Sequence, residues 1–403
     1  MNNLFFENLK KIEIYSLPFA AFFLLISTAA LNFFIVIAVL FGLIRIIFEK
    51  KDILFVSKKF MLYALLIFLF LVLSSYYTIG NFENIYITLK KYIKFLYIPV
   101  LFYHIKVNQN QILIIKFLLA GGFIVLFLSY LKYFDIVNFS NLYSFFEMNL
   151  VGTISHASVF QTSIVHGVVF SFLFYLSIYM AKKQNNNYLY IFSILCLFNI
   201  VFMNDSRNSY LVVFFLILSV IYFYFNKKNY MVTTISLIFI FSLSVLPISN
   251  TFKKTINDTA YDIKLLVNDN YTSSIGLRSL WILNGVENIY KNPLFGTGVG
   301  SYEKTIQNFI KKNDINVNKN LAVSNNPHNE FISLSTQLGL FGFMLYIFFL
   351  YELFKDSRKK FLSTGAFVIV LISSFFNALF YDNVFGLFMV IVISLVYQKE
   401  FDQ

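Results

Sequence analysis

The sequence predicts an all-α integral membrane protein with about twelve transmembrane helices and one large helical loop outside the membrane. Hydrophobic residues make up 58% of the 403 residues and charged residues only 13%, whereas a soluble domain carries about 25% charged residues. The mean hydropathy of +0.71 agrees with a membrane protein. The one cysteine, Cys196, lies within an apolar run, so no disulfide, zinc cluster or thiol pair is expected within the chain.

Apolar runs of about 20 residues are long enough to cross a bilayer, and twelve of them can be placed along the chain. They predict transmembrane helices 1–9 within residues 1–249, a polar outer loop with short amphipathic helices over 250–327, and transmembrane helices 10–12 within 328–403. The expected spans are 13–29, 31–48, 60–79, 86–104, 111–131, 163–181, 187–203, 209–226, 230–249, 330–352, 361–379 and 381–398.

Basic residues predict which loops face the cytoplasm. With the N-terminus inside, every short cytoplasmic loop carries Lys or Arg, as the positive-inside rule requires. Both termini are then cytoplasmic and residues 250–327 lie outside. Short loops therefore account for most of the net charge of +12, and no nucleic-acid partner is expected. The first apolar run lacks a small-residue cleavage site, so we expect it to be a retained span.

Three lysines lie at an outer helix end, where the positive-inside rule disfavours them. Lys90 and Lys94 are four residues apart and are expected on one helix face, with Lys91 beside them. They indicate either an anionic partner bound at this helix end or long side chains that reach membrane-lipid phosphates.

Arg207 lies between two apolar runs. Ser206 is expected to cap the helix that follows, which places Arg207 in its first turn at the outer boundary. An arginine so close to the bilayer requires a partner or a polar cavity. A structural pair with Asp205 and a bidentate contact to phosphate both satisfy that requirement.

The outer segment 250–327 is too long for a plain connection. Its apolar pattern predicts an amphipathic helix over 275–290 that carries Arg278, either beneath a cap over an outward cavity or on the exposed surface. A second short helix is expected over 301–312. The glycine-rich stretch 296–300 lacks the Lys-Ser/Thr of a phosphate-binding P-loop, so a compact turn between the two helices is the better interpretation.

His328 follows Asn326-Pro327, where the polar segment returns to an apolar run. Asparagine at the N-cap and proline at the first helical position predict that His328 lies in the first turn of a membrane helix. The positive end of the helix dipole favours a neutral imidazole and attracts anions, which suits a general base. At 100° per residue, Ser335, Gly339 and Gly342 are expected near the same face, where their small size would admit a lipid chain or a neighbouring helix.

Arg207, Arg278 and His328 are therefore expected at one membrane level. Two guanidinium groups and a helix N-terminus form a site for a dianion such as a lipid diphosphate. A neutral histidine there can take a proton from an acceptor hydroxyl while the arginines stabilise the leaving diphosphate. The sequence shows neither an outward carboxylate pair with metal-ligand spacing nor a Walker motif, so we expect no metal, no cofactor and a pre-activated donor.

These residues resemble motifs of the O-antigen ligase family. Arg207 and Leu211 form an Arg-x3-Leu element, and His328-Asn329 is followed by Gly339 and Gly342 in a His-Asn-x9-Gly-x2-Gly element. Arg278, which precedes Leu280-Trp281, is similar to the second arginine of the family's large periplasmic loop. The resemblance extends over essentially the whole chain.

The resemblance implies a GT-C-like membrane glycosyltransferase of the bacterial inner membrane, metal-independent and inverting, with its active site facing the periplasm. It would transfer polysaccharide from undecaprenyl diphosphate to lipid A-core. His328 would activate the acceptor, and Arg207 and Arg278 would bind the diphosphate. Asn329, Gly339 and Gly342 are expected to bind substrate as members of the motif. Lys90, Lys91 and Lys94 match no family motif, and their place in the donor site is inferred from charge alone.

Three alternatives remain at this point. A ligase of the same family would use another acceptor, such as a protein or another surface lipid. A polysaccharide polymerase of the same superfamily would share the donor and the architecture. A transporter of lipid-linked sugars would instead show charges in the middle of its spans and internal repeats. The ionisable residues of this chain gather at one membrane face, which disfavours transport.

Overall fold

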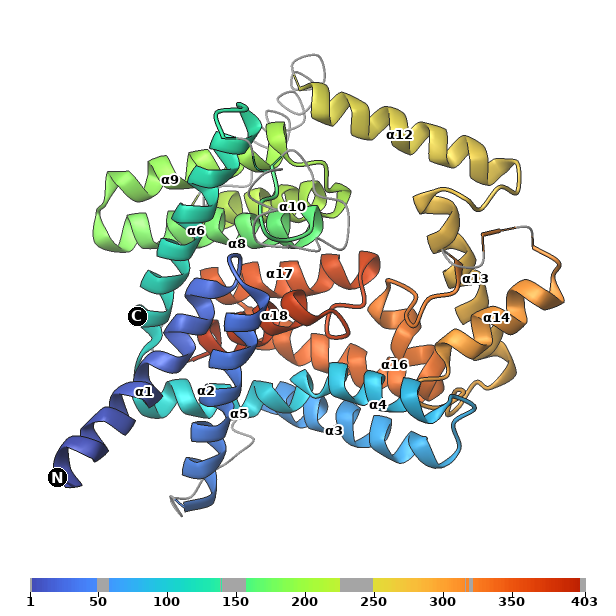
Figure 1. The fold of residues 1–403 in the computed structure, drawn as a ribbon, viewed down its shortest axis with the longest axis horizontal. Helices are drawn as coiled ribbons and strands as arrows, with labels where there is room; N and C mark the ends of the chain where they lie inside the picture. Colours follow the sequence, from blue (N-terminus) through green and yellow to red (C-terminus); the bar gives the residue numbers. More distant parts are fainter. Residues whose placement is uncertain are drawn as a thin grey trace.

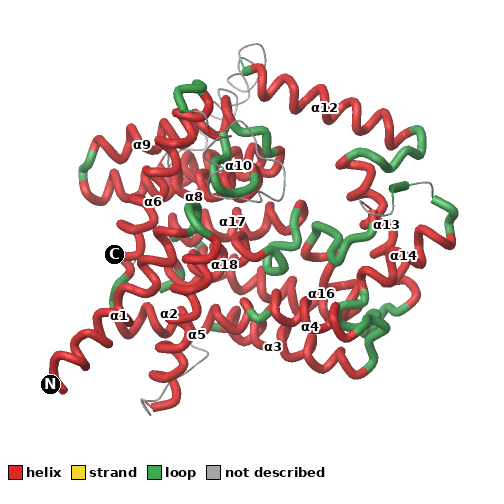
Figure 2. Tube along the Cα trace, in the orientation of Figure 1, coloured by secondary structure: helices red, strands yellow, loops and turns green. Residues whose placement is uncertain are grey.

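The computed structural model describes residues 2–48, 58–137, 139, 157–224, 249–315, 317–318 and 322–398. All regular secondary structure in these residues is helical (Figure 2). The predicted span 230–249 lies almost wholly outside the described residues. Six of the described helices are long and apolar enough to cross a membrane, namely α2, α3 with its 3-10 turn, α6, α8, α10 and α16.

The helices follow the predicted apolar runs closely at most positions. Their bounds are α1 (Asn2–Phe23), α2 (Thr28–Phe48), α3 (Lys59–Leu73) with the 3-10 turn Ser74–Tyr76, α4 (Phe82–Tyr92), α5 (Lys94–Asn108), α6 (Gln111–Tyr133), α8 (Ser163–Gln184), α9 (Asn187–Phe198) with the π-helical turn Asn199–Met203, α10 (Arg207–Tyr224), α12 (Asn250–Val267), α13 (Ser274–Lys291), α14 (Tyr302–Lys312), α16 (Glu330–Ser357), α17 (Phe361–Phe376) and α18 (Asn383–Val396).

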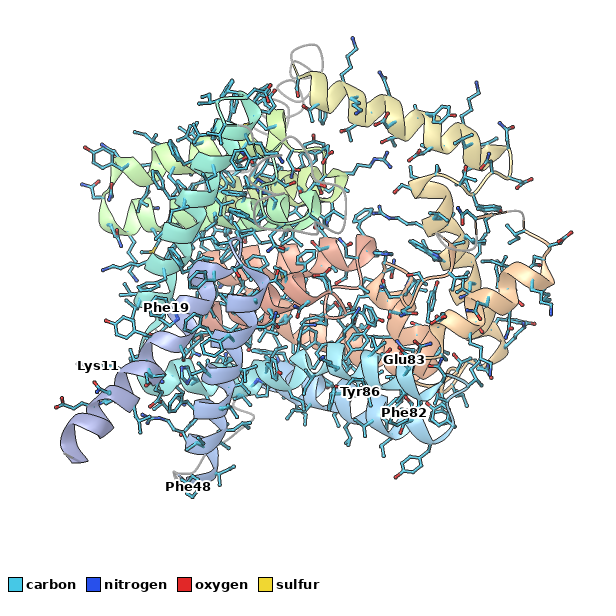
Figure 3. All side chains as sticks on the ribbon, viewed as in Figure 1. Lys11, Phe19, Phe48, Phe82, Glu83 and Tyr86 are labelled. Atoms are coloured by element: carbon cyan, nitrogen blue, oxygen red, sulfur yellow. The ribbon has the colours of Figure 1, made fainter. Side chains whose placement is uncertain are left out.

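Helix α18 forms the centre of the bundle (Figure 1). Every residue from Val384 to Val396 is buried, as expected for a helix that is apolar on all sides. Ser394 Oγ donates to the carbonyl oxygen of Ile98 on α5 at 3.1 Å, which fixes the register of these two helices. On the outside, large aromatic side chains such as Phe48 and Phe82 project from the helices (Figure 3), as a lipid-facing surface requires.

Helices α12, α13 and α14 form the outer segment and lie at the side of the bundle opposite both chain ends (Figure 1). Leu280 and Trp281 of α13 pack against Tyr302 and Ile306 of α14 in a separate small core. The predicted amphipathic helix and the short helix after the glycine-rich turn are confirmed by α13 and α14.

The predicted span 86–104 is divided into α4 and α5, which meet at Ile93. Lys90 is exposed, whereas Lys94 is 3% exposed and donates to the carbonyl oxygens of Lys91 and Phe380 at 2.8 and 3.0 Å. The prediction that Lys90 and Lys94 share one face is therefore wrong, because the helix is interrupted between them and Lys94 turns into the protein.

Helix α16 reverses direction at Gly339. The backbone there has φ 65° and ψ −156°, a conformation that is essentially restricted to glycine. The ring of Phe331 lies 6.2 Å from that of Phe343 and 5.3 Å from that of Tyr346, although a continuous helix would separate Phe331 and Tyr346 by about 22 Å. We call residues 330–338 the outer arm and residues 340–357 the membrane arm.

The reversal corrects two predictions. Residues 330–352 are not one straight span, because the helix is interrupted and reversed at Gly339. Ser335, Gly339 and Gly342 do not continue one helical face, because the 100° periodicity is interrupted at Gly339 itself.

The glycine-rich turn fills the break in α16. The amides of Thr297 and Gly298 donate to the carbonyl oxygens of Thr336 and Gln337, both at 2.9 Å. On the other side of the break, the amides of Leu340 and Phe341 donate to residues 293 and 294 at 2.7 and 3.3 Å. The polar groups that the two helix ends leave unpaired are thus satisfied by residues 293, 294, 297 and 298.

We predict that Gly339→Ala destabilises the protein. An added Cβ would lie 2.5 Å from the carbonyl oxygen of Leu294, and the positive φ alone costs an alanine about 1–3 kcal/mol. The apparent unfolding temperature of the purified protein in detergent should fall. Leu340→Ala, at an exposed neighbouring position, should change it much less. Equal unfolding temperatures for the wild type and Gly339→Ala would contradict the reversal.

Candidate functional site

Arg207 occupies the first position of α10, as predicted. Ser206 Oγ accepts a hydrogen bond from the amide of Ser209 at 3.4 Å, which caps the helix. The Arg207 guanidinium donates through two nitrogens to Asp262 Oδ2 of α12, at 3.1 and 3.2 Å. The partner is therefore Asp262 of the outer segment and not the predicted Asp205.

Arg278 lies close to this pair, in the second turn of α13. Burial, together with the positive charge of Arg207, lowers the pKa of Arg278 below its ordinary value, and Asp262 opposes the shift. No hydrogen bond or ion pair within the described ranges engages the Arg278 guanidinium. Arg278 is thus a partly buried cation close to a second cation. An anionic ligand bound there would offset their repulsion and stabilise both charges.

His328 lies in the loop before α16 and not in its first turn. Its φ is +49°, and the side chain of Asn326 accepts a hydrogen bond from the His328 amide at 2.9 Å. Asn329 is the N-cap, because its side chain accepts from the amide of Ile332 at 3.0 Å. The prediction of Asn326 as N-cap is wrong by one turn, since Asn326 closes a local turn instead of starting the helix.

The imidazole of His328 stacks on the indole of Trp281, with ring centroids 4.9 Å apart and planes inclined by 29°. Trp281 is held in place because its Nε1 donates to the carbonyl oxygen of Ala322 at 2.8 Å. Burial lowers the pKa of His328 to about 4, with smaller contributions from the charges of Arg278 and Lys91. The imidazole is therefore neutral at physiological pH and able to accept a proton.

The outer end of α17 is hydrogen-bonded to both the segment that carries Arg207 and the segment that carries His328. Asn329 Nδ2 donates to the carbonyl oxygen of Phe375 at 3.0 Å, and Asn208 Nδ2 donates to Ser373 Oγ at 3.3 Å. The neighbours of these asparagines in the chain are His328 and Arg207. Since both side-chain groups of Asn329 bond within the protein, we infer that Asn329 positions His328 instead of contacting substrate.

The three lysines of the outer helix end are separated in the structure. The charge of Lys91 acts on His328, and its amino group lies 4.0 Å from the ring centroid of Tyr381. Lys94 is buried and bonded to backbone carbonyls, whereas Lys90 is exposed near Tyr86. Lys91 is thus the one of the three lysines whose charge reaches His328, and the contribution of Lys90 and Lys94 to donor binding stays a prediction.

Glu330, which was not among the predicted site residues, begins α16 two positions after His328 and is fully buried. Its Oε2 accepts from the amide of Phe380 at 3.1 Å, while its Oε1 has no hydrogen-bond partner among the described residues. The charge of Lys94 acts on this carboxyl group. Glu330 therefore joins the start of α16 to the connection between α17 and α18.

An apolar groove of about 530 Å³ begins beside the site at Asn329. It lies between the two arms of α16 and α17, and its walls include Phe331, Ile347, Leu350 and Phe375. Neither Gly339 nor Gly342 lines it. Gly339 instead lies against the backbone of Leu294, and Gly342 is packed between Leu334 and Leu338, so both glycines shape the bend of α16.

The part of the chain that the structure describes contains no group of three or more His, Cys, Asp or Glu side chains that could hold a metal ion. The polar groups that converge at the site are two guanidinium groups, an ammonium group, a neutral imidazole and the carboxylate that pairs with Arg207.

A bundle of apolar helices with a polar helical segment at one end defines a multi-pass membrane protein. Residues 191–347 match the family model described as O-antigen ligase, and this match supports membership of the chain in the O-antigen ligase family. The matched region includes Arg207, Arg278 and His328. The family implies a membrane ligase or polymerase that acts on lipid-linked polysaccharide. No curated protein matches the chain.

The neutral state of His328 predicts a specific dependence of stability on pH. Between pH 6.5 and about 4, an unfolded His328 binds a proton that the folded protein does not bind. Stability should therefore fall as the pH decreases through this range. The apparent unfolding temperature of the wild type should decrease more than that of His328→Gln, in which the other histidines are unchanged. Parallel curves for the two proteins would contradict the buried, neutral imidazole.

Proposed function

We propose that the protein is an O-antigen ligase that transfers polysaccharide from undecaprenyl diphosphate to a hydroxyl group of lipid A-core. The observation that supports this proposal is that Arg278 lies within electrostatic reach of both Arg207 and the neutral His328, which come from two other segments. The site would lie at the periplasmic face of the bacterial inner membrane, with both chain ends in the cytoplasm and twelve crossings of a GT-C-like fold.

In the proposed reaction, Arg278 and Arg207 bind the diphosphate of the donor. Arg207 would exchange part of its contact with Asp262 for phosphate oxygens, and Lys91 adds positive charge. His328 removes the proton from the acceptor hydroxyl as its oxygen attacks the anomeric carbon of the donor sugar. The bond from that carbon to the diphosphate oxygen breaks, and the electron pair leaves with the diphosphate. Fixed cations supply the charge stabilisation without a metal.

The apolar groove between the arms of α16 and α17 accounts for the lipid part of the donor. It starts at Asn329, adjacent to His328, and continues past Ile347 to Phe354 among apolar side chains. A diphosphate held at Arg278 would leave its isoprenoid chain at the entrance of this groove. A single groove fits a lipid with one chain, and the acceptor, which has several acyl chains, would approach from the open membrane.

Gene deletion followed by complementation tests this function. Loss of the gene should leave lipid A-core bare while full-length polymer accumulates on its carrier. The wild-type gene should restore the decorated product. His328→Ala should not, since loss of a general base lowers the rate by about 10²–10⁴. Arg278→Ala should fail for lack of diphosphate binding. Gel analysis of lipopolysaccharide and of the carrier-linked pool provides the measurement.

Lys304→Ala provides the matched control, because it removes an exposed cation from α14 of the same outer segment and should complement fully. All variants must reach the membrane in equal amounts. If the deletion strain carries lipid A-core with a single repeat unit, ligation is intact and the protein is a polymerase. Full complementation by His328→Ala would assign His328 to packing against Trp281.

A further inference from the structure

A polar pocket of about 190 Å³ lies between α13 and α14, apart from the candidate site. Its walls include Asn284, Glu287 and Asn288 from α13 and Asn308 and Phe309 from α14. Ile79, in the turn that precedes α4, closes one side. None of these residues belongs to the motifs on which the proposed function rests.

The polar groups of the pocket are held in place by one another. Asn288 Nδ2 donates to the backbone oxygen and to Oδ1 of Asn284 at 2.7 and 2.8 Å, and Asn284 Nδ2 donates to Thr305 Oγ1 at 3.1 Å. Lys291 and Lys312 both donate to Oε1 of Glu287. Within the described residues, Asn288 Oδ1, Glu287 Oε2 and the side-chain amide of Asn308 form no hydrogen bond.

These free groups match the chemistry of a sugar. Each hydroxyl of a pyranose both donates and accepts, so a wall of amide and carboxylate groups can bond neighbouring hydroxyls. Phe309 and Ile79 supply apolar contact for the C–H face of the ring. The groove between α16 and α17 has the opposite character, since its walls are almost entirely apolar. We propose that the pocket between α13 and α14 binds one glycosyl residue of the polysaccharide on the donor.

The position of the pocket on α13 supports this ligand. Asn288 follows Arg278 by ten residues on the same helix, a rise of about 15 Å. Figure 1 shows that α13 and α14 lie at one side of the bundle, away from both chain ends. A polysaccharide whose diphosphate end is bound at Arg278 and whose chain extends away from the membrane would pass this pocket. The inference therefore rests on the proposed function and adds recognition of the sugar chain beyond the reacting residue.

The pocket is also connected to the site through the small core of the outer segment. Thr305 Oγ1, in the pocket wall, donates to the backbone oxygen of Tyr302 at 2.8 Å. The Tyr302 hydroxyl donates to the backbone oxygen of Trp281 at 2.9 Å, and Trp281 stacks on His328. The glycan pocket and the imidazole are thus built on one packed unit.

The test is direct binding of sugar to the full-length protein in detergent. The probe is the oligosaccharide that mild acid releases from the surface polysaccharide of the source cell, which carries neither diphosphate nor lipid. Saturation-transfer NMR should show binding to the wild type. Asn308→Ala should weaken binding by about tenfold, as expected for the loss of one or two hydrogen bonds to an ordered ligand. Asn308 is exposed and makes no internal bond, so this variant should fold normally.

Tyr290→Ala, at an 86% exposed position on α13, should bind the oligosaccharide as the wild type does, and so should His328→Ala. The His328 variant separates the proposed catalytic role from the proposed glycan pocket, because it should lose polysaccharide transfer while it still binds the oligosaccharide. Failure of the wild type to bind, or unchanged binding by Asn308→Ala and by the pocket-filling Asn288→Leu, would overturn the glycan pocket whatever the result for transfer.

Discussion

The closure of the break in α16 is the constraint on which the rest of the outer face depends. Four backbone hydrogen bonds join residues 293–298 to the two arms that meet at Gly339. Without them, buried amides and carbonyls at the two helix ends would be left unpaired, at a cost of about 1–3 kcal/mol for each group. The same bonds attach the C-terminal end of α13 to α16, so Arg278 and His328 are held in a fixed relative position. Gly339, which permits the break, therefore helps to position the site, although it lines neither the groove nor the polar pocket.

A second fixed point is the outer end of α17. Through Asn208 and Asn329 it receives a hydrogen bond from each of the segments that carry Arg207 and His328. Each bond contributes only about 1 kcal/mol to stability, but together they set the distance between the cation and the base. Asp262 completes the arrangement from α12, because it pairs with Arg207, whereas Arg278 has no ion-pair partner among the described residues. A site built in this way is ordered before an anion arrives, which lowers the cost of binding it.

The sequence singled out the charged residues of the candidate site but did not predict how they are arranged. Arg207, Arg278 and His328 could be identified because isolated cations and a histidine are unusual at the edge of an apolar protein. Helices α13 and α14 could be predicted from periodicity and from the stop at Asn292-Pro293. The reversal at Gly339 could not be predicted, because a glycine in an apolar run is equally compatible with a straight helix that packs closely against a neighbour. Only the tertiary contact with residues 293–298 distinguishes a reversed helix from a straight one. The pairing of Arg207 with Asp262, 55 positions away, likewise depends on tertiary structure.

In the proposed reaction, the diphosphate of the donor lies between Arg278 and His328, with its lipid in the groove that begins at Asn329. A cryo-electron microscopy structure of the protein in a lipid nanodisc with undecaprenyl diphosphate would test this placement. We expect diphosphate density within hydrogen-bonding distance of the Arg278 guanidinium and isoprenoid density between the arms of α16 and α17. Diphosphate bound at another surface, or at this site with Arg278 turned away from it, would rule out the proposed binding mode.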